Sequence, residues 1–391
     1  RFTREETQQP QKGGWYERVA LRGWPVLPAY DWNGNHFYSD TSCMWAWADG
    51  GEKHNQSDKI YHQLGFEIEP IKNWKTSADF NYRIQNSRGH NWTLPLLAYG
   101  KEGAPYYKDA NTSVAESNYR ENYLNFSART EYDLTLAKAH HFHALAGMQI
   151  ENLKQDYLSA SRVGMMDLTK PEINLTNGLK DGVATTPGVS GYRNEWAVVG
   201  FFGRLNYDYK SRYLFEANLR SDGSSRFREG NRWKTFPSFS LGWNIAEEKF
   251  MEPSRNWLDM LKLRFSYGSL GNQNVTNWYQ TYLTISPSAQ GAPWLQNGNK
   301  VATVGSPGIV SENLTWERVE TYNIGVDWAM LHNRLTGSFN WYTRSTHDMV
   351  GNGKTLPAIL GTGVPKTNNT DLQARGWELT LGWQDRLANG L

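Results

Sequence analysis

Residues 235–245, which read TFPSFSLGWNI, carry the pattern that decides the fold. After the proline, bulky apolar side chains alternate with small polar ones. The apolar members are Phe239, Leu241, Trp243 and Ile245, and the polar members are Ser238, Ser240, Gly242 and Asn244. Because successive side chains of a β-strand point to opposite faces, this stretch predicts a strand with one apolar face and one polar face.

The same alternation recurs along most of the chain and predicts an all-β fold. Alternating segments occupy residues 78–84, 124–136, 142–150, 201–222, 261–268, 322–328, 335–343 and 376–383. Helical periodicity is scarce, and we count about eleven strands. A soluble β-sandwich alternates in the same way, so the period alone does not distinguish a protein core from a lipid environment.

The lengths of the connections distinguish these two environments. Long connections are predicted at residues 85–121, 152–195, 223–236, 270–318 and 345–373, and short or medium ones at 137–141, 210–212, 246–260 and 329–333. Outer-membrane barrels show this rhythm, because tight turns face the periplasm and long loops face the outside.

Aromatic residues beside the short turns support the same interpretation. They are Tyr207, Tyr209, Tyr213, Trp328 and Trp383. An amphipathic ring at the end of a membrane strand can rest at the level of the lipid headgroups. The sequence therefore predicts a transmembrane antiparallel β-barrel, with apolar rows facing lipid and polar rows facing a wet lumen.

The composition argues against several other classes. With 41 basic and 39 acidic residues the net charge is +2, so a nucleic-acid partner is not expected. The single cysteine, Cys43, excludes an intrachain disulfide and a multi-cysteine metal site. No run approaches 18 apolar residues, which excludes a transmembrane helix. The N-terminal stretch RFTREETQQPQKGG has no apolar signal-peptide core, so we expect that an export signal was removed or that the chain starts within a longer protein.

Four motifs that follow one another in order resemble a known family. They are RSDGSSRF at 220–227, FPSFSLGW at 236–243, EKF at 248–250 and LKLRFSYGSLGNQ at 261–273. Together they resemble the C-terminal half of SusC/RagA-type TonB-dependent transporters of Bacteroidetes, in which F-P-S-x-S-x-G-W opens a strand and E-x-F sits in the following turn. The segments NLTWERVETYNIGVD (313–327) and GWELTL (376–381) are similar to later strands of that family. The resemblance covers residues 194–384 and, more weakly, 57–160.

The resemblance implies a barrel of about 22 strands with a plugged lumen. Residues 1–391 would then be the C-terminal portion of the transmembrane barrel with long extracellular loops, and the N-terminal extension and plug domain would lie outside this chain. The segment LPAYDWNGNHFYSD (27–40) would be an outer loop. The implied location is the bacterial outer membrane, as a multi-pass protein. The implied partners are outer-membrane lipid, a SusD-like surface lipoprotein, the TonB–ExbB–ExbD energising complex and an oligosaccharide or peptide substrate.

Aromatic residues of the long loops are the candidate substrate contacts, because flat rings can stack on sugars or hold peptide side chains. These candidates are Trp278, Tyr279, Trp294, Trp92, Tyr106 and Tyr107. Packing of loop against loop, or against a partner lid, is the alternative for each of them. On the polar rows, Arg220, Asp222 and Arg264 are candidates to face the lumen or the plug, and plain wall electrostatics is the alternative.

Catalytic and metal chemistry find little support in the sequence. His140, His141 and His143 have no acidic or cysteine ligand close in sequence, so no metal and no cofactor are expected. Residues 31–35 and 222–225 resemble calcium loops only faintly, and turn chemistry explains both, although a structural calcium ion in an outer loop stays open. No nucleophile elbow, phosphate loop or paired carboxylates appear, so the protein is not expected to be an enzyme.

Three functions fit these observations. Energised import through TonB is the favoured one, in which a plugged lumen blocks diffusion and work on the plug releases the cargo. A passive outer-membrane porin would share the barrel but lack the plug. A surface glycan-binding β protein would use the tryptophan-rich loops, and unlike a barrel it would stay in aqueous buffer.

Overall fold

The computed structural model describes residues 1–11, 30–36, 49–99, 103–273, 277–288, 291, 293–305, 307–357, 359 and 361–385. Of the predicted outer loop at 27–40, only residues 30–36 are described, and Cys43 lies outside the described residues. Among the residues described, no helix has the length and apolar character needed to cross a membrane.

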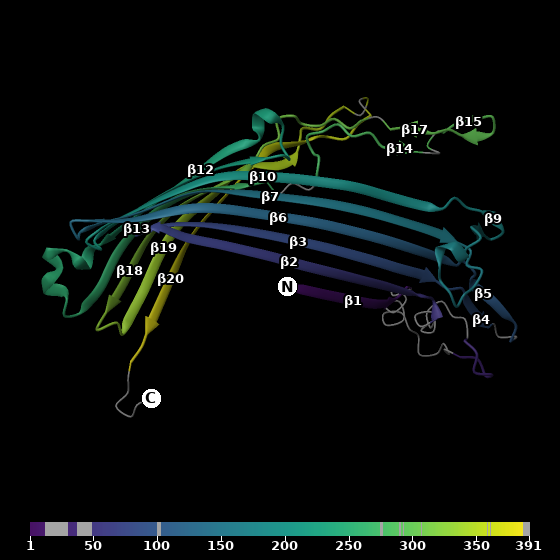
Figure 1. Ribbon diagram of the computed structural model, residues 1–391, viewed down its shortest axis with the longest axis horizontal. Coiled ribbons are helices and arrows are strands. Elements are labelled where there is room, and N and C mark those ends of the chain that lie inside the picture. Colours follow the sequence, from purple (N-terminus) through teal and green to yellow (C-terminus); the bar gives the residue numbers. More distant parts are fainter. Residues whose placement is uncertain are drawn as a thin grey trace. The chain divides into compact units, whose positions relative to one another are not determined.

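Twelve strands of the described chain form one sheet in the order β1-β2-β3-β6-β7-β10-β11-β12-β13-β18-β19-β20 (Figure 1). They are Phe2–Pro10 (β1), Glu52–Ile71 (β2), Trp74–Thr93 (β3), Ser113–Leu136 (β6), His140–Val163 (β7), Gly188–Tyr209 (β10), Tyr213–Ser224 (β11), Trp233–Asn244 (β12), Leu258–Asn272 (β13), Glu317–Met330 (β18), Leu335–Asn352 (β19) and Lys366–Trp383 (β20). Strands that follow one another in the sheet follow one another along the chain and pair antiparallel, as between β10 and β11. The predicted all-β class is confirmed, and the main sheet of the described residues has one strand more than the approximate count from the sequence.

Short elements occupy the connections. The small strands are Leu96–Tyr99 (β4), Pro105–Asp109 (β5), Leu179–Lys180 (β8), Val183–Ala184 (β9), Pro287–Ser288 (β14), Leu295–Gln296 (β15), Asn299–Lys300 (β16) and Thr303–Val304 (β17). The short helical turns are Ile173–Leu175 (η1), Glu229–Asn231 (η2), Ile245–Glu247 (η3) and Lys249–Ser254 (η4). The chain divides into two compact parts: the first comprises residues 1–63, 81–124 and 153–195, and the second comprises residues 64–80, 125–152 and 196–391.

Strand β12 contains the stretch that predicted the fold. Leu241 lies opposite Phe215 on β11 and Phe265 on β13, so apolar side chains form a continuous row across three strands. Phe239, Leu241 and Trp243 are 39%, 49% and 37% exposed, so this row is a surface and not the interior of a sandwich. One boundary differs from the prediction: β12 begins at Trp233, and the FPS motif lies inside the strand instead of opening it.

Most strands are longer than predicted, β6, β7 and β10 among them, and the long loops are correspondingly shorter. β6 and β7 have 24 residues each and β10 has 22, so the connection predicted at 152–195 shrinks to residues 164–187. The other predicted loops shorten in the same way, to 94–112, 225–232, 273–316 and 353–365.

The sequence pattern missed the outer ends of β7 and β10 because these ends are polar on both faces. On the face that continues the apolar row of β7, Lys154 pairs with Glu195 at 2.9 Å. The next position on that face, Asp156, pairs with Arg193 at 3.1 Å. Both faces of these segments are polar, so they lack the alternation by which a strand between lipid and water is recognised.

The short and medium connections lie where predicted, but only the turn at 210–212 keeps its predicted bounds; those predicted at 246–260 and 329–333 lie at 245–257 and 331–334. Lys210 and Ser211 both have positive φ (53° and 56°), the geometry of a tight primed turn between β10 and β11. Tyr209 and Tyr213 flank this turn with ring centroids 6.2 Å apart. The turn predicted at 137–141 covers only residues 137–139, and His140 and His141 are the first residues of β7.

The predicted E-x-F turn after β12 is fastened by its glutamate. The Glu248 carboxylate accepts hydrogen bonds from Tyr213 Oη at 2.6 Å and from Trp243 Nε1 at 3.1 Å. Arg212 lies 3.6 Å from its other oxygen. These hydrogen bonds lower the pKa of Glu248 below its ordinary value.

Glu248→Gln is expected to lower thermal stability at pH 7 by several degrees, because the charged acceptor of two ring donors is lost. Since the folded pKa is lowered, the contribution of Glu248 is complete above the ordinary carboxyl pKa and disappears as the pH falls through the folded value. The difference between wild type and variant should therefore shrink at pH 3. The measurement is the temperature at which the folded band is lost on electrophoresis, at both pH values.

Glu247→Gln is the matched control, because the neighbouring Glu247 makes only an exposed 3.8 Å pair with Arg255. Equal melting temperatures for the two variants at pH 7 would show that the Glu248 anchor does not hold the turn.

Candidate functional site

Arg220 and Asp222 lie on the polar face of β11 and contact each other. Arg220 Nε donates to both Asp222 carboxylate oxygens, at 3.0 and 2.8 Å, and an Arg220 terminal nitrogen donates to Gln149 Oε1 on β7 at 3.1 Å. Asp222 is only 6% exposed, which is a costly position for a carboxylate unless a cation holds it. The structure thus places both predicted residues on the polar face and joins them in one ion pair.

Arg264 on β13 forms a second, separate ion pair on the same face. Its Nε lies 2.6 Å from Asp327 Oδ2, and a terminal nitrogen donates a hydrogen bond to Asp327 Oδ1 at 2.7 Å. The same nitrogen donates to Asn340 Oδ1 on β19 at 3.1 Å. Each guanidinium is thus held by the wall itself, so the contacts fit the wall-electrostatics alternative, and direct contact with a cargo or plug stays a prediction.

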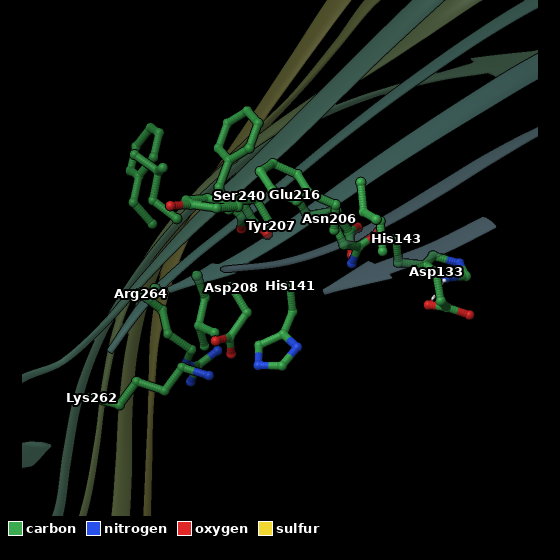
Figure 2. Close-up of a pocket in the computed structure, with 18 of the residues that line it drawn as sticks. Asp133, His141, His143, Asn206, Tyr207, Asp208, Glu216, Ser240, Lys262 and Arg264 are labelled. Atoms are coloured by element: carbon green, nitrogen blue, oxygen red, sulfur yellow. Dashed lines mark hydrogen bonds and ion pairs between the residues drawn. The ribbon is translucent and has the colours of Figure 1, made fainter. Parts of the chain in front are cut away.

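A hollow of about 530 Å³ opens on the polar side of strands β6, β7 and β10–β13 (Figure 2). His143 Nδ1 lies 2.8 Å from Asp133 Oδ1, and Asn206 Nδ2 donates to Glu216 Oε2 at 2.8 Å. Figure 2 shows the labelled side chains of His141, Asp208, Lys262 and Arg264 projecting to one side of the sheet. Mixed, mutually bonded charges of this kind make a hydrated surface.

The histidines of this hollow were considered only as metal ligands in the sequence. His141 and His143 lie an even number of residues before Gln149 on β7 and so point to the same face as Gln149. This alternation could have assigned both histidines to the polar rows from the sequence. Among the residues that the structure describes, no group of three or more His, Cys, Asp or Glu side chains could hold a metal ion.

Four buried side chains fasten the outer loops of the second part. Phe227 and Leu314 are 1% exposed, and Phe236 and Trp316 are nearly as buried. The Trp316 ring packs 5.6 Å from that of Phe227 and 5.7 Å from that of Phe236, and its Nε1 donates to Arg232 O at 2.7 Å. We call these four residues the outer-loop core. Sequence reasoning missed it, although its members lie within the RSDGSSRF, FPSFSLGW and NLTWE motifs.

Two arginines of the 225–232 loop hold the loop that contains Trp278 and Tyr279. The Arg226 guanidinium lies 5.3 Å from the Trp196 ring centroid and 5.7 Å from that of Trp278, and burial lowers the pKa of Arg226. Arg228 Nε donates to the Thr281 carbonyl at 2.9 Å. Trp278, one of the candidate substrate contacts, therefore packs against the 225–232 loop, which is the alternative considered for it.

The remaining predicted aromatics have different surroundings. Tyr279 meets Tyr282 edge to face at 6.4 Å, and Trp294 is 57% exposed. Tyr106 and Tyr107 lie on the short strand β5. Trp278, Tyr279 and Trp294 belong to the second part of the chain, and Trp92, Tyr106 and Tyr107 belong to the first. Whether any of them touches substrate stays a prediction.

Trp92 lies outside the loop in which it was predicted. It is the penultimate residue of β3, where it packs between the rings of His54 and His90 at 4.9 and 5.0 Å. Along β3 it shares the face of Phe80 and Tyr82, which continues the apolar row. The loop boundary was wrong because β3 extends past its alternating segment.

The profile of the family described as TonB dependent receptor-like, beta-barrel, matches residues 4–391. The chain belongs to this family. The predicted transmembrane barrel fold, the SusC/RagA resemblance and the outer-membrane location are confirmed. In a TonB-dependent receptor barrel, the exposed row of Phe239, Leu241 and Trp243 faces acyl chains, and the polar face that carries the hollow faces the lumen.

Several relatives within the family resemble this chain. TonB-dependent receptor P39 of Formosa agariphila is 28% identical over 330 residues, which cover 83% of this chain and 29% of that protein. TonB-dependent receptor SusC of Bacteroides thetaiotaomicron is 37% identical over 191 residues, covering 49% of this chain and 19% of SusC.

A solved structure shares the fold. The RagAB peptide importer in its closed-closed state superposes with a TM-score of 0.75 at 22% identity, covering 91% of this chain and 38% of that one. This chain therefore spans well under half the length of each of these three relatives.

Proposed function

We propose that this receptor barrel imports large polar nutrients, oligosaccharides or peptides, across the outer membrane at the expense of energy supplied through TonB. The observation that carries the proposal is the two-faced sheet of a TonB-dependent receptor, with an exposed apolar row on one side and mutually bonded charges on the other. A wide hydrated wall suits cargo that keeps much of its own hydration. Among the relatives, RagAB is named a peptide importer, which supports cargo of this size.

Work on a plug is the physical reason for energy coupling. A plug inside the lumen blocks passive diffusion, so cargo captured outside enters only when the plug is displaced. We propose that residues 1–391 are the C-terminal portion of a barrel of about 22 strands whose plug and N-terminal extension lie elsewhere in the protein. A SusD-like surface lipoprotein would cover the outer opening, and the TonB–ExbB–ExbD complex would act on the plug.

The outer loops provide the surface for capture in this scheme. Tyr279 and Trp294 would meet cargo or the lipoprotein, while Trp278, Arg226 and the outer-loop core would fix their positions. Arg220, Asp222 and Arg264 would line the passage below. The transporter would act without a cofactor and without catalysing a covalent step.

Uptake by cells carrying the full-length protein tests the proposal. Accumulation of the cargo is expected to fall to background when the TonB gene is deleted or the proton gradient is collapsed, and to return when either is restored. Cells lacking this transporter provide the baseline. Uptake that persists unchanged without TonB would identify a passive porin instead.

A further inference from the structure

Tyrosine and carboxamide side chains gather on the polar face of the first part, on the neighbouring strands β6, β7 and β10 (Figure 1). The rings of Tyr157 and Tyr192 stack with centroids 5.2 Å apart and planes 24° apart. Gln155 Nε2 donates to Tyr119 Oη at 2.5 Å, and Asn194 Nδ2 lies 3.4 Å from Gln155 Oε1. We call this group the tyrosine patch; its members are Tyr119, Gln155, Tyr157, Tyr192 and Asn194.

The alternation of the strands places the patch on the lumenal face. Residues an even number of positions apart along a strand point to the same face. Gln155 and Tyr157 therefore share the face of Gln149 on β7, and Asn194 shares the face of Arg204 on β10. Gln149 and Arg204 belong to the polar rows. At the same level, the opposite face carries the Lys154–Glu195 and Arg193–Asp156 ion pairs. The patch therefore lies on a stretch of these strands that is polar on both faces.

The charges beside the patch are already neutralised. Arg83 donates to Glu121 Oε1 at 2.5 Å and lies over the Tyr123 ring at 5.2 Å. The second oxygen of Glu121 accepts the Tyr119 hydroxyl at 2.6 Å. The patch thus offers ring faces, amide groups and hydroxyls next to a closed ion pair, and does not offer a charge to a charged ligand.

This chemistry suits a neutral sugar better than a peptide. The apolar C–H face of a pyranose can pack on a tyrosine ring, and carboxamide groups can donate to and accept from neighbouring sugar hydroxyls. Peptide recognition commonly uses a free strand edge, apolar pockets or charges for the chain termini. β6 and β7 are interior strands of the sheet, whereas β10 pairs with β11 only along Val198–Tyr209.

We propose that the tyrosine patch is a wall subsite for neutral oligosaccharide, so the cargo is a glycan. The inference rests on the proposed transport function and narrows its substrate class. Tyr192, which is 45% exposed, supplies the accessible ring face. Gln155 and Asn194 supply the hydrogen bonds that orient the sugar.

Binding to the full-length transporter in detergent tests the inference by calorimetry, with one panel of neutral oligosaccharides and one panel of mixed-sequence peptides of similar length. At least one oligosaccharide should bind, and Tyr192→Ala or Asn194→Ala should each weaken that binding about tenfold. Tyr192→Phe keeps the ring and should bind nearly as the wild type does. Leu158→Ala is the matched control, since Leu158 follows Tyr157, points to the opposite face and is exposed.

The outcomes separate this inference from the transport proposal. Binding of peptides alone, or oligosaccharide binding that Tyr192→Ala and Asn194→Ala leave unchanged in correctly folded protein, would overturn the glycan subsite while TonB-dependent uptake could stand. Uptake that does not need TonB, together with oligosaccharide binding that both variants weaken, would overturn energised import and leave the subsite in place.

Discussion

The substitution Leu241→Arg is expected to abolish the folded form of this receptor in the outer membrane. Leu241 lies in the middle of the apolar row of β12, between Phe215 and Phe265 in register, and half of its surface is exposed. An arginine on the lipid face of a barrel costs up to about 2–4 kcal/mol, with the largest value at the bilayer midplane and less toward the headgroups. A cost of that size is a large fraction of the net stability of most proteins. The measurement is the amount of heat-modifiable barrel in purified outer membranes.

Ser240→Arg is the matched control, because Ser240 is the preceding residue, points to the opposite face and lies in register with Glu216 and Ser266 of the polar rows. In a hydrated lumen the new guanidinium keeps its water, so the folded barrel should accumulate almost as in the wild type. Equal accumulation of the two variants would mean that the apolar row of β12 does not touch acyl chains.

The parts of the fold that the sequence predicts are those that lie between two different solvents. Leu241 and Ser240 could be assigned to opposite faces because lipid on one side and water on the other impose a period of two. The turn at Lys210 and Ser211 was predictable for a related reason, since aromatic residues mark both of its ends. Arg220, Asp222 and Arg264 could be placed on the polar face by the same parity, and the structure puts them there.

The features that the sequence did not predict lie where the two faces of a strand have the same surroundings, or where distant segments meet, and neither situation produces an alternating pattern in the sequence. The outer ends of β7 and β10 are wet on both faces, so Lys154 and Arg193 were placed in a loop. Trp92 was misplaced for the same reason, and the tyrosine patch escaped notice because its members read as loop residues. The outer-loop core joins Phe227 to Trp316, which are far apart in the chain, and no local pattern predicts that contact.

Trp316→Ala is expected to detach the outer loops while leaving the barrel folded. Trp316 is 4% exposed, and removing a buried tryptophan of this kind costs about 3–5 kcal/mol because its contacts are lost and a cavity remains. The indole also donates the hydrogen bond that holds the Arg232 carbonyl. Without it, the 225–232 loop should open to trypsin, which cleaves after arginine, at Arg226, Arg228 and Arg232. The measurement is the rate of this cleavage on intact cells.

Trp294→Ala is the control for this experiment, because Trp294 is a loop tryptophan with 57% of its surface exposed and should tolerate removal within about 0.5 kcal/mol. Cleavage of the Trp316→Ala loop no faster than that of the Trp294→Ala loop would show that the outer-loop core does not hold it. Detachment should also reduce cargo capture, because Arg226 leaves its place between Trp196 and Trp278 when the loop opens. Trp316→Ala should therefore lose both cargo capture and trypsin resistance. A variant that loses only a substrate contact should lose cargo capture but keep its trypsin resistance.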